Sequence, residues 1–186
     1  MENDITFDAI LVGYLGSLAA VKAAGEIIDR LLAPGGVAIV DPAMADNGKL
    51  YSGFDEDYVR AIGSLAGKAD MILPNVTEAA ILSGLPYLGN VDKNYVNQLL
   101  DGLHHPCIVL TGVDFGDDCT GVVLQEGTMQ HEYRHKRIGK GCHGTGDIFA
   151  SVFTGALMQG KNRLDAAKIA ADFTCRCIEN TVNAPA

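Results

Sequence analysis

The sequence predicts an α/β fold with an open, mostly parallel sheet flanked by helices. Short apolar runs typical of buried strands alternate with longer stretches that carry apolar residues at helical spacing. Such alternation predicts β-helix-β units, in which parallel strands are joined by right-handed crossovers. With 186 residues and 48% hydrophobic content, the chain is long enough for a sizeable core. We therefore expect a single α/β domain over residues 1–186.

The first half of the chain predicts strands and helices in strict alternation. The expected strands cover residues 7–12, 37–40 and 71–73, and the expected helices cover residues 18–32, 55–66 and 77–82. The run from Phe7 to Val12 is mostly apolar, so we expect this strand to be buried on both faces. Ser17 is placed to cap the first helix, which ends at Pro34-Gly35-Gly36.

The second half breaks this alternation before its last two helices. A helix over residues 92–103 and a strand over residues 107–110 continue the pattern. Two strands, at residues 122–125 and 129–134, then flank Glu126-Gly127-Thr128, which is a hairpin signal. We expect the basic cluster at the end of this hairpin to be a solvated strand face, although it could help a polyphosphate into a site. Its members are His131, Arg134, His135, Lys136 and Arg137.

Composition and charge argue against several classes of protein. The formal net charge of −9 disfavours a surface that binds nucleic acid or anionic membranes. Acidic residues stand near the N-terminus where a signal peptide would carry Lys or Arg, and no apolar run reaches the length of a membrane span. The five cysteines are scattered without a paired metal-binding spacing, as expected for reduced thiols. These features predict a cytoplasmic protein.

The stretch from Gly139 to Asp147, Gly-Lys-Gly-Cys-His-Gly-Thr-Gly-Asp, predicts a phosphate site. Its four glycines allow positive φ angles and a close approach of the backbone to a ligand. The next residues have helical spacing, so the loop opens a helix whose N-terminal N–H groups and dipole attract an anion. Asp147 would repel that anion unless it has a chemical task, such as taking a proton from an attacking hydroxyl. The alternative is that Asp147 only caps the helix or favours its dipole.

Two familiar nucleotide motifs are excluded. Residues 139–144 spell G-x-G-x-x-G, but a dinucleotide fold needs that loop after its first strand, whereas two helices and the end of the chain follow here. A Walker A loop occurs nowhere in the sequence. The predicted phosphate site therefore belongs to another class.

Acidic and amide side chains follow the predicted strands at the edge where open α/β sheets bind ligands. Asp41 and Asp46 come after the second strand and could hold a hydrated Mg²⁺, which prefers one or two carboxylates plus substrate phosphates. Asn75 and Glu78 follow the next strand in the same way. The alternative is structural, with Asp41 and Asp46 in turns and Asn75 as a helix cap.

Taken together, four segments resemble the ribokinase-like superfamily and, within it, the pyridoxal kinase family. They are residues 41–51 (DPAMADNGKLY), 74–79 (PNVTEA), 111–112 (TG) and 144–147 (GTGD). Residues 7–17 (FDAILVGYLGS) are similar to the same family, so the resemblance covers nearly the whole chain. It implies ATP-dependent phosphorylation of the 5′-hydroxymethyl group of pyridoxal, pyridoxamine or pyridoxine.

The resemblance also implies a role for each matching residue. Asp147 matches the catalytic base, which also contacts the vitamer, and Tyr14 matches a side chain against the pyridine ring. The expected anion hole is Gly144, Thr145 and Gly146. The expected ATP contacts are Asp46, Asn75, Glu78, Thr111 and Gly112. The expected Mg²⁺ contacts, partly through water, are Asp41, Asp46 and Glu78. The resemblance further implies a monovalent cation and, in the complete enzyme, a homodimer. These roles suit phosphoryl transfer, which needs positioning, charge neutralisation and a proton acceptor.

One departure from the family pattern is large. Kinases of this family carry, before the strand that begins here at Phe7, a further segment with the first strands and a lid over the substrate. We therefore expect this chain to be incomplete at the N-terminus and, alone, to turn over poorly or not at all.

Two alternatives stay open at this point. Hydroxymethylpyrimidine kinases are similar around residues 143–146, as another ribokinase-like kinase would be, but they usually have cysteine where Asp147 stands. They also lack the continuation over residues 46–51. The alternative from another class is a nucleotide-binding module that kept the fold and lost turnover. Nucleotide binding without phosphorylation would favour this second alternative.

Overall fold

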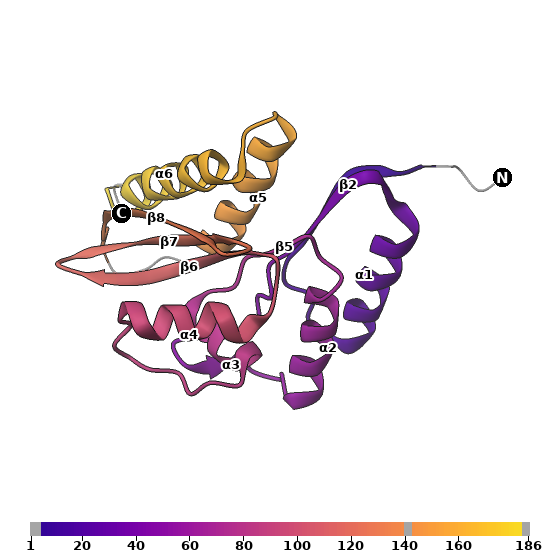
Figure 1. The fold of residues 1–186 in the computed structure, drawn as a ribbon, viewed down its shortest axis with the longest axis horizontal. Helices are drawn as coiled ribbons and strands as arrows, with labels where there is room; N and C mark the ends of the chain where they lie inside the picture. The colour runs from indigo at the N-terminus through magenta and orange to yellow at the C-terminus, as the bar shows by residue number, and fades with distance from the viewer. Residues whose placement is uncertain (1–4, 140–142, 184–186) are drawn as a thin grey trace.

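The computed structural model describes residues 5–139 and 143–183 and has three layers, with helices on both faces of one sheet (Figure 1). Neighbouring strands follow the chain order, as β1-β2-β5-β6-β7-β8. Their bounds are β1 (Phe7–Val12), β2 (Leu32–Val40), β5 (Met71–Ile72), β6 (Cys107–Gly116), β7 (Cys119–Glu126) and β8 (Met129–Lys136). The first four strands are parallel and the last two are antiparallel. The predicted mostly parallel sheet, with a hairpin before the Gly-Thr-Gly-Asp loop, is confirmed.

Helices divide between the two faces of the sheet. They are α1 (Leu18–Leu31), α2 (Glu56–Ala66), α3 (Val76–Ser83), α4 (Lys93–Leu103), α5 (Thr145–Met158) and α6 (Arg163–Val182). Helices α1 to α4 share a core with one face, and α5 and α6 share a second core with the other. In β2, Ala38 and Val40 point into the first core and Ile39 into the second, and all three are fully buried. This two-sided burial explains why the strand is continuously apolar.

Side-chain helix caps are present at all but one helix of the described residues, including the caps expected at Ser17 and Asn75. Five helices begin at a side chain that accepts a hydrogen bond from the backbone N–H three residues on: Ser17, Asp55, Asn75, Asp92 and Asn162. Helix α5 begins instead at Gly144, which has φ of 81° and provides no side-chain cap. The helix at the predicted phosphate loop is therefore the one whose N-terminus is open to an anion.

The prediction that residues 7–12 are buried on both faces is wrong. Only Val12 is buried, and Phe7 is 46% exposed. The reason is that β1 is an edge strand with one neighbour, β2, in the described sheet. Strand β2 also begins earlier than expected, at Leu32, because Pro34-Gly35-Gly36 forms an irregularity in the β1–β2 pairing instead of a loop before the strand.

Strand β6 is longer than predicted, and the hairpin that it forms with β7 was missed. The sequence suggested an end at Thr111-Gly112, where the β6–β7 register shifts and Gly112 has φ of 67°. This is a bulge within the strand, after which β6 continues to Gly116. The turn to β7 is Asp117-Asp118, with φ of 49° and 60°. Aspartate tolerates such angles, but the pair lacks the glycine of the strongest hairpin signals.

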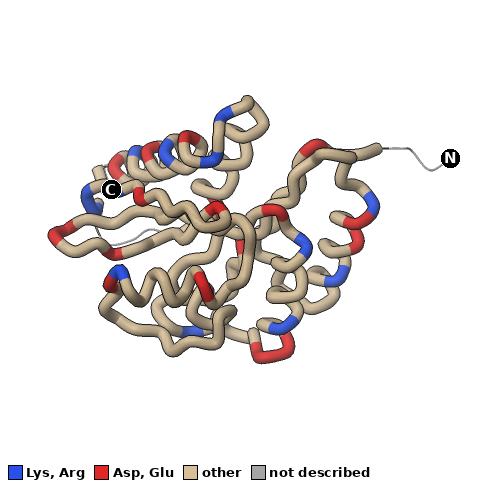
Figure 2. The backbone as a smooth tube through the Cα atoms, viewed as in Figure 1, with Lys and Arg blue, Asp and Glu red and all other residues tan. Residues whose placement is uncertain are grey.

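Charged residues of both signs are spread over the backbone trace (Figure 2). Acidic and basic residues alternate along α6, and α1 carries both kinds. None of the helices in the described ranges is long and apolar enough to cross a membrane. The four cysteines within those ranges, Cys107, Cys119, Cys175 and Cys177, are free thiols.

Gly121 provides a test of the β7–β8 pairing. A Cβ atom there would lie 2.0 Å from the carbonyl oxygen of Tyr133 on β8. We predict that Gly121→Ala lowers the free energy of unfolding by about 1–3 kcal/mol or more, because the two strands must move apart. The control is Gly155→Ala in α5, where nothing lies within 4 Å of the added Cβ, and it should raise that energy by about 0.5–1 kcal/mol. Urea unfolding measures both, and equal stabilities would contradict the described register.

Candidate active site

The carboxyl ends of the parallel strands bring together polar residues that are far apart in the sequence. The Asp41 N–H donates to the carbonyl of Val12 at the end of β1, over 2.8 Å. The Thr111 N–H donates to the carbonyl of Pro74 over 2.9 Å, and Asn75 and Thr111 form a parallel bridge. Backbone pairing thus sets Asp41, Asn75 and Thr111 along one edge of the sheet.

Glu78 ties two of these segments together. It is 1% exposed, and its Oε1 accepts the N–H groups of Met44 (2.9 Å) and Ala45 (3.4 Å). Its Oε2 accepts the N–H of Asn75 (2.9 Å), and Asn75 Oδ1 accepts the N–H of Glu78 in return (2.9 Å). Asn75 also donates its Nδ2 to the carbonyl of Ala45 (2.8 Å). The helix cap that the sequence suggested as an alternative is present, and the same residues hold the loop after β2.

Asp46 lies in a small hairpin made of β3 (Ala45–Asp46) and β4 (Lys49–Leu50). Its turn, Asn47-Gly48, has positive φ angles of 50° and 76°. The carboxylate of Asp46 accepts hydrogen bonds from the backbone N–H (2.8 Å) and side-chain Nδ2 (2.9 Å) of Asn47. The Gly48 N–H donates to Thr77 Oγ1 in α3 (3.0 Å). The turn-forming alternative for this loop is therefore also present, and it leaves Asp46 exposed.

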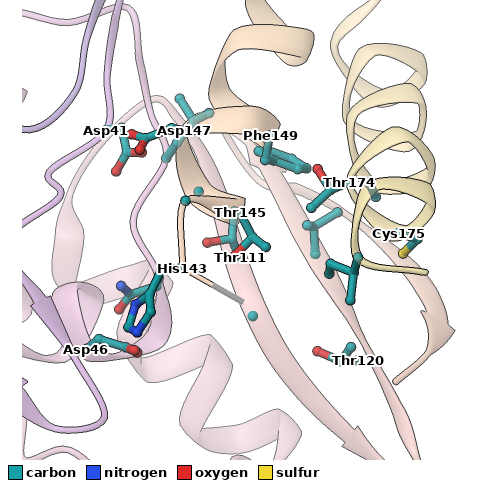
Figure 3. A pocket seen from close by; sticks show the side chains of 18 of the residues that line it. Asp41, Asp46, Thr111, Thr120, His143, Thr145, Asp147, Phe149, Thr174 and Cys175 are labelled. Carbon is teal, nitrogen blue, oxygen red and sulfur yellow. The ribbon is translucent and has the colours of Figure 1, made fainter. Parts of the chain in front are cut away.

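The glycine loop places Asp147 beside Asp41 (Figure 3). A Cβ on Gly146 would lie 3.8 Å from Oδ2 of Asp41, and a Cβ on Gly13, just after β1, would lie 3.8 Å from Oδ1 of Asp147. These short distances show how closely the start of α5 approaches the ends of β1 and β2. Gly141, one of the four glycines of the predicted loop, lies outside the described residues.

A cavity of 530 Å³ joins these segments (Figure 3). Every predicted site residue lines it: Tyr14, Asp41, Asp46, Asn75, Glu78, Thr111, Gly112, Gly144, Thr145, Gly146 and Asp147. Lining residues that the sequence analysis missed as site residues include Tyr51, Thr120, His143, Thr174, Cys175 and Ile178. His135 and Arg137 also line the cavity, as the alternative for the basic end of their cluster allowed, because β8 pairs with β7 at its rim. Arg137, just after β8, is exposed as well. Only their place in the basic cluster could have pointed to them.

The acidic side of the cavity carries uncompensated negative charge. Burial, and next the charge of Asp147, raise the pKa of Asp41 to about 6, against the lowering effect of the Ala43 N–H. Burial, and next the charge of Asp41, raise the pKa of Glu78 to about 7, although three backbone N–H groups oppose this. No ion pair among the described residues involves Asp41, Glu78 or Asp147. A bound cation would stabilise these carboxylates in their ionised form.

The donor set fits a hydrated metal ion better than a protein cage. Among the described residues, no group of three or more His, Cys, Asp or Glu side chains could hold a metal ion by itself. Mg²⁺ usually takes one or two carboxylates and keeps waters or substrate phosphates as its other ligands. Asp41, Asp46 and Glu78 all line the cavity, and their binding of Mg²⁺, partly through water, stays a prediction.

The fold and the site define a class of protein. An open α/β sheet whose edge joins a glycine loop, an uncapped helix N-terminus, an adjacent aspartate and buried carboxylates is the arrangement of ribokinase-like small-molecule kinases. The chain belongs to the phosphomethylpyrimidine kinase family, which it matches over residues 1–185. The resemblance to pyridoxal kinases of the ribokinase-like superfamily is confirmed by the relatives and solved structures that follow.

Solved structures of relatives share this fold over almost the whole chain. A Bacteroides thetaiotaomicron protein assigned as a phosphomethylpyrimidine kinase, crystallised with pyridoxal, is 31% identical with a TM-score of 0.87, over 98% of this chain and 66% of that one. Pyridoxal kinase from Lactobacillus plantarum is 31% identical with a TM-score of 0.85, over 96% and 64% of the two chains. Pyridoxal kinase from Staphylococcus aureus, in complex with AMP-PCP and pyridoxal, is 25% identical with a TM-score of 0.72, over 89% and 59%.

Characterised relatives include both kinds of kinase. Pyridoxal kinase from Arabidopsis thaliana is 29% identical over 178 residues, which are 89% of this chain and 56% of that protein. A hydroxymethylpyrimidine/phosphomethylpyrimidine kinase from Bacillus subtilis is 30% identical over 185 residues, which are 98% of this chain and 67% of that protein. The chain thus spans between about half and two thirds of the length of these relatives.

We predict that stability depends on pH through Glu78. Its pKa is about 7 in the folded chain against 4.5 as the ordinary value, so its protonated form stabilises the fold fully below about pH 4.5, and this stabilisation is lost as the pH rises through 7. Without metal, the free energy of unfolding should fall by roughly 1–3 kcal/mol over that window. Glu78→Gln should reduce the slope, and part of it should remain because the pKa of Asp41 is also raised, to about 6.

The matched control is Asp101→Asn, at an exposed site on α4. It should keep the slope of the unaltered chain. Urea unfolding in EDTA between pH 4.5 and 8 measures all three proteins. Equal slopes in the unaltered chain and in Glu78→Gln would show that the pKa of Glu78 is not raised.

Proposed function

We propose that this chain carries the phosphoryl-transfer site of an ATP-dependent kinase for the 5′-hydroxymethyl group of pyridoxal, pyridoxamine or pyridoxine. The observation that carries the proposal is that one cavity contains the uncapped N-terminus of α5, the exposed Asp147 and the buried carboxylates of Asp41 and Glu78. Such a site can bind an anion, a cation and a hydroxyl group side by side. Relatives named pyridoxal kinases, and one that binds pyridoxal, support this choice of substrate.

In this proposal Asp147 is the catalytic base. It takes the proton from the 5′-hydroxyl as that oxygen attacks the γ-phosphorus of ATP, and ADP leaves. Gly144, Thr145 and Gly146 form the anion hole, because backbone N–H groups at a helix N-terminus point at such a phosphoryl group. The exposure of Asp147 to the cavity supports its role, since a base must reach its substrate.

The nucleotide phosphates lie along the edge of the sheet in this proposal. Asn75, Thr111 and Gly112 contact them, and Gly112 suits a close approach because it has no side chain and a φ of 67°. Asp46 and Glu78 hold Mg²⁺, partly through water, and Asp41 adds negative charge beside it. Bound Mg²⁺ supplies neutralisation of the phosphate charge. The monovalent cation, the homodimer and the cytoplasmic location stay predictions from the sequence.

A kinase assay tests the proposal directly. The chain, and a form extended by its upstream genomic sequence, are incubated with ATP, Mg²⁺ and each B6 vitamer, and the phosphorylated vitamer and ADP are measured. Equal amounts of the two products support the proposal. ATP binding without either product would favour the module that binds nucleotide but has lost turnover.

A second candidate is phosphorylation of hydroxymethylpyrimidine. The Bacillus subtilis relative with this activity in its name favours it. Two features disfavour this candidate. The resemblance implies that such kinases usually carry cysteine at the position of Asp147, and that they lack the segment 46–51. The same assay with hydroxymethylpyrimidine as acceptor decides between the two, by comparing kcat/KM for the two rings.

The first functional prediction concerns Asp147. Asp147→Asn should lower kcat about 10²–10⁴-fold, the usual effect of losing a general base. The Kd of AMP-PCP should change little, because the N–H groups that bind phosphate remain. Isothermal titration and the kinase assay measure the two quantities in the form that turns over, and near-normal turnover with asparagine would rule out the base assignment.

The second concerns Asp46 and Glu78. Asp46→Asn and Glu78→Gln should each raise the Mg²⁺ concentration for half-maximal activity, by roughly 10-fold, with little effect on the KM of the vitamer. Their effects should be non-additive in a double-mutant cycle, since both act on one ion. Asp101→Asn serves as control. Additive losses with an unchanged Mg²⁺ dependence would return both residues to a purely structural role.

A further inference from the structure

Tyr14 is an exposed aromatic ring that is nevertheless held in place. It follows β1, lines the cavity and is 61% exposed. Gly16, with φ of 71°, lies beneath the ring, because a Cβ there would be 3.3 Å from Cε1 of Tyr14 and 3.7 Å from its Cζ. The ring of Phe54 lies on another side, with 5.7 Å between centroids and an interplanar angle of 35°. An exposed ring with two such contacts has little freedom to turn.

Phe54 connects three tyrosine rings. It stacks on Tyr58, with 3.8 Å between centroids and an angle of 4°, and it contacts Tyr51 at 6.4 Å and 45° as well as Tyr14. Tyr14 and Tyr51 line the cavity, whereas Phe54 and Tyr58 do not. Phe54 therefore contacts both rings in the cavity wall and is placed to restrict their motion.

Tyr58 is the buried end of this stack. It is 3% exposed and belongs to the core shared with α1 to α4. Its hydroxyl has no hydrogen-bond partner within the described ranges, so aromatic packing is what holds it. Burial raises the pKa of Tyr58. The stacked pair of Tyr58 and Phe54 is thus the buried side of the contact between Phe54 and Tyr14.

We propose that Phe54 is a positioning residue, which holds Tyr14 as a rigid platform for the flat heteroaromatic ring of the substrate. This inference rests on the proposed function, in which Tyr14 lies against that ring. A platform that is already ordered loses little conformational freedom when the substrate binds. Phe54 therefore increases the affinity for the substrate ring without contacting that ring. The residues proposed to contact the phosphates lie on other segments, and none of them belongs to the aromatic cluster.

The test compares three variants of the whole chain. Phe54→Leu removes the flat ring but keeps an apolar side chain, Phe54→Tyr restores the ring, and Phe115→Leu is the matched control. Phe115 is also partly buried and packs on the same core, but it contacts Arg134 on β8 and does not line the cavity. The Kd values of pyridoxine and of AMP-PCP with Mg²⁺ are measured by isothermal titration.

Phe54→Leu should weaken pyridoxine binding roughly 3- to 10-fold, the range expected from losing one aromatic pair, and leave the Kd of AMP-PCP unchanged. Phe54→Tyr should restore the Kd of pyridoxine, and Phe115→Leu should alter neither value. Loss of binding for both ligands in Phe54→Leu would indicate a general folding defect, for which Phe115→Leu is the control. That result would overturn the positioning role. Unchanged pyridoxine binding in Phe54→Leu would overturn it as well.

A ligand-free measurement separates this inference from the proposed function. The chain contains no tryptophan, so Tyr14→Trp introduces a single tryptophan, whose fluorescence can be excited separately from that of the tyrosines. Adding Phe54→Leu should lower the anisotropy of Trp fluorescence by releasing the ring, and adding Phe115→Leu should not. If the unaltered chain binds no pyridoxine, the proposed substrate is wrong. The anisotropy still tests whether Phe54 holds the ring at position 14. Equal anisotropy with and without Phe54→Leu would contradict the positioning role of Phe54.

Discussion

The site depends on one buried carboxylate. Glu78 accepts N–H groups from the loop after β2 and from the start of α3, so a single side chain fixes two segments that lie more than thirty residues apart in the sequence. Burying a carboxylate costs free energy unless its oxygens are hydrogen-bonded. The three N–H groups offset part of that cost, and the raised pKa of Glu78 shows that some of it remains. The loop that carries Asp46 is thus held by Glu78, whereas pairing with β1 sets Asp41 and the start of α5 sets Asp147.

The remaining charge imbalance suits a metal-bound phosphate. On one side, Asp41, Glu78 and Asp147 face each other without a cationic partner among the described residues. On the other side, the uncapped N-terminus of α5 and Arg137, which pairs with Asp114 over 2.8 Å, attract anions. A cation alone or an anion alone would satisfy only half of the cavity. A phosphate that brings its own metal ion, as in the proposed function, would satisfy both halves.

Structural and functional explanations of the same residue do not compete here. Asn75 caps α3, as its place in the sequence suggested, yet its side chain also holds the carbonyl of Ala45 and stands in the cavity wall. Asn47-Gly48 forms a tight turn, and that turn displays Asp46. Local capping and turn formation are the means by which this chain fixes its polar groups at the edge of the sheet.

The sequence by itself determined whatever depends on neighbouring residues. The alternation of strands and helices and the caps Ser17 and Asn75 are written in local pattern. The segments that line the cavity were recognisable from their resemblance to a family. Tertiary structure decided what depends on distant partners. The exposure of β1 depends on its place at the edge of the sheet, the entry of His135 and Arg137 into the cavity depends on β7–β8 pairing, and the pKa of Glu78 depends on burial. No local pattern encodes these, because each arises from residues that folding alone brings into contact.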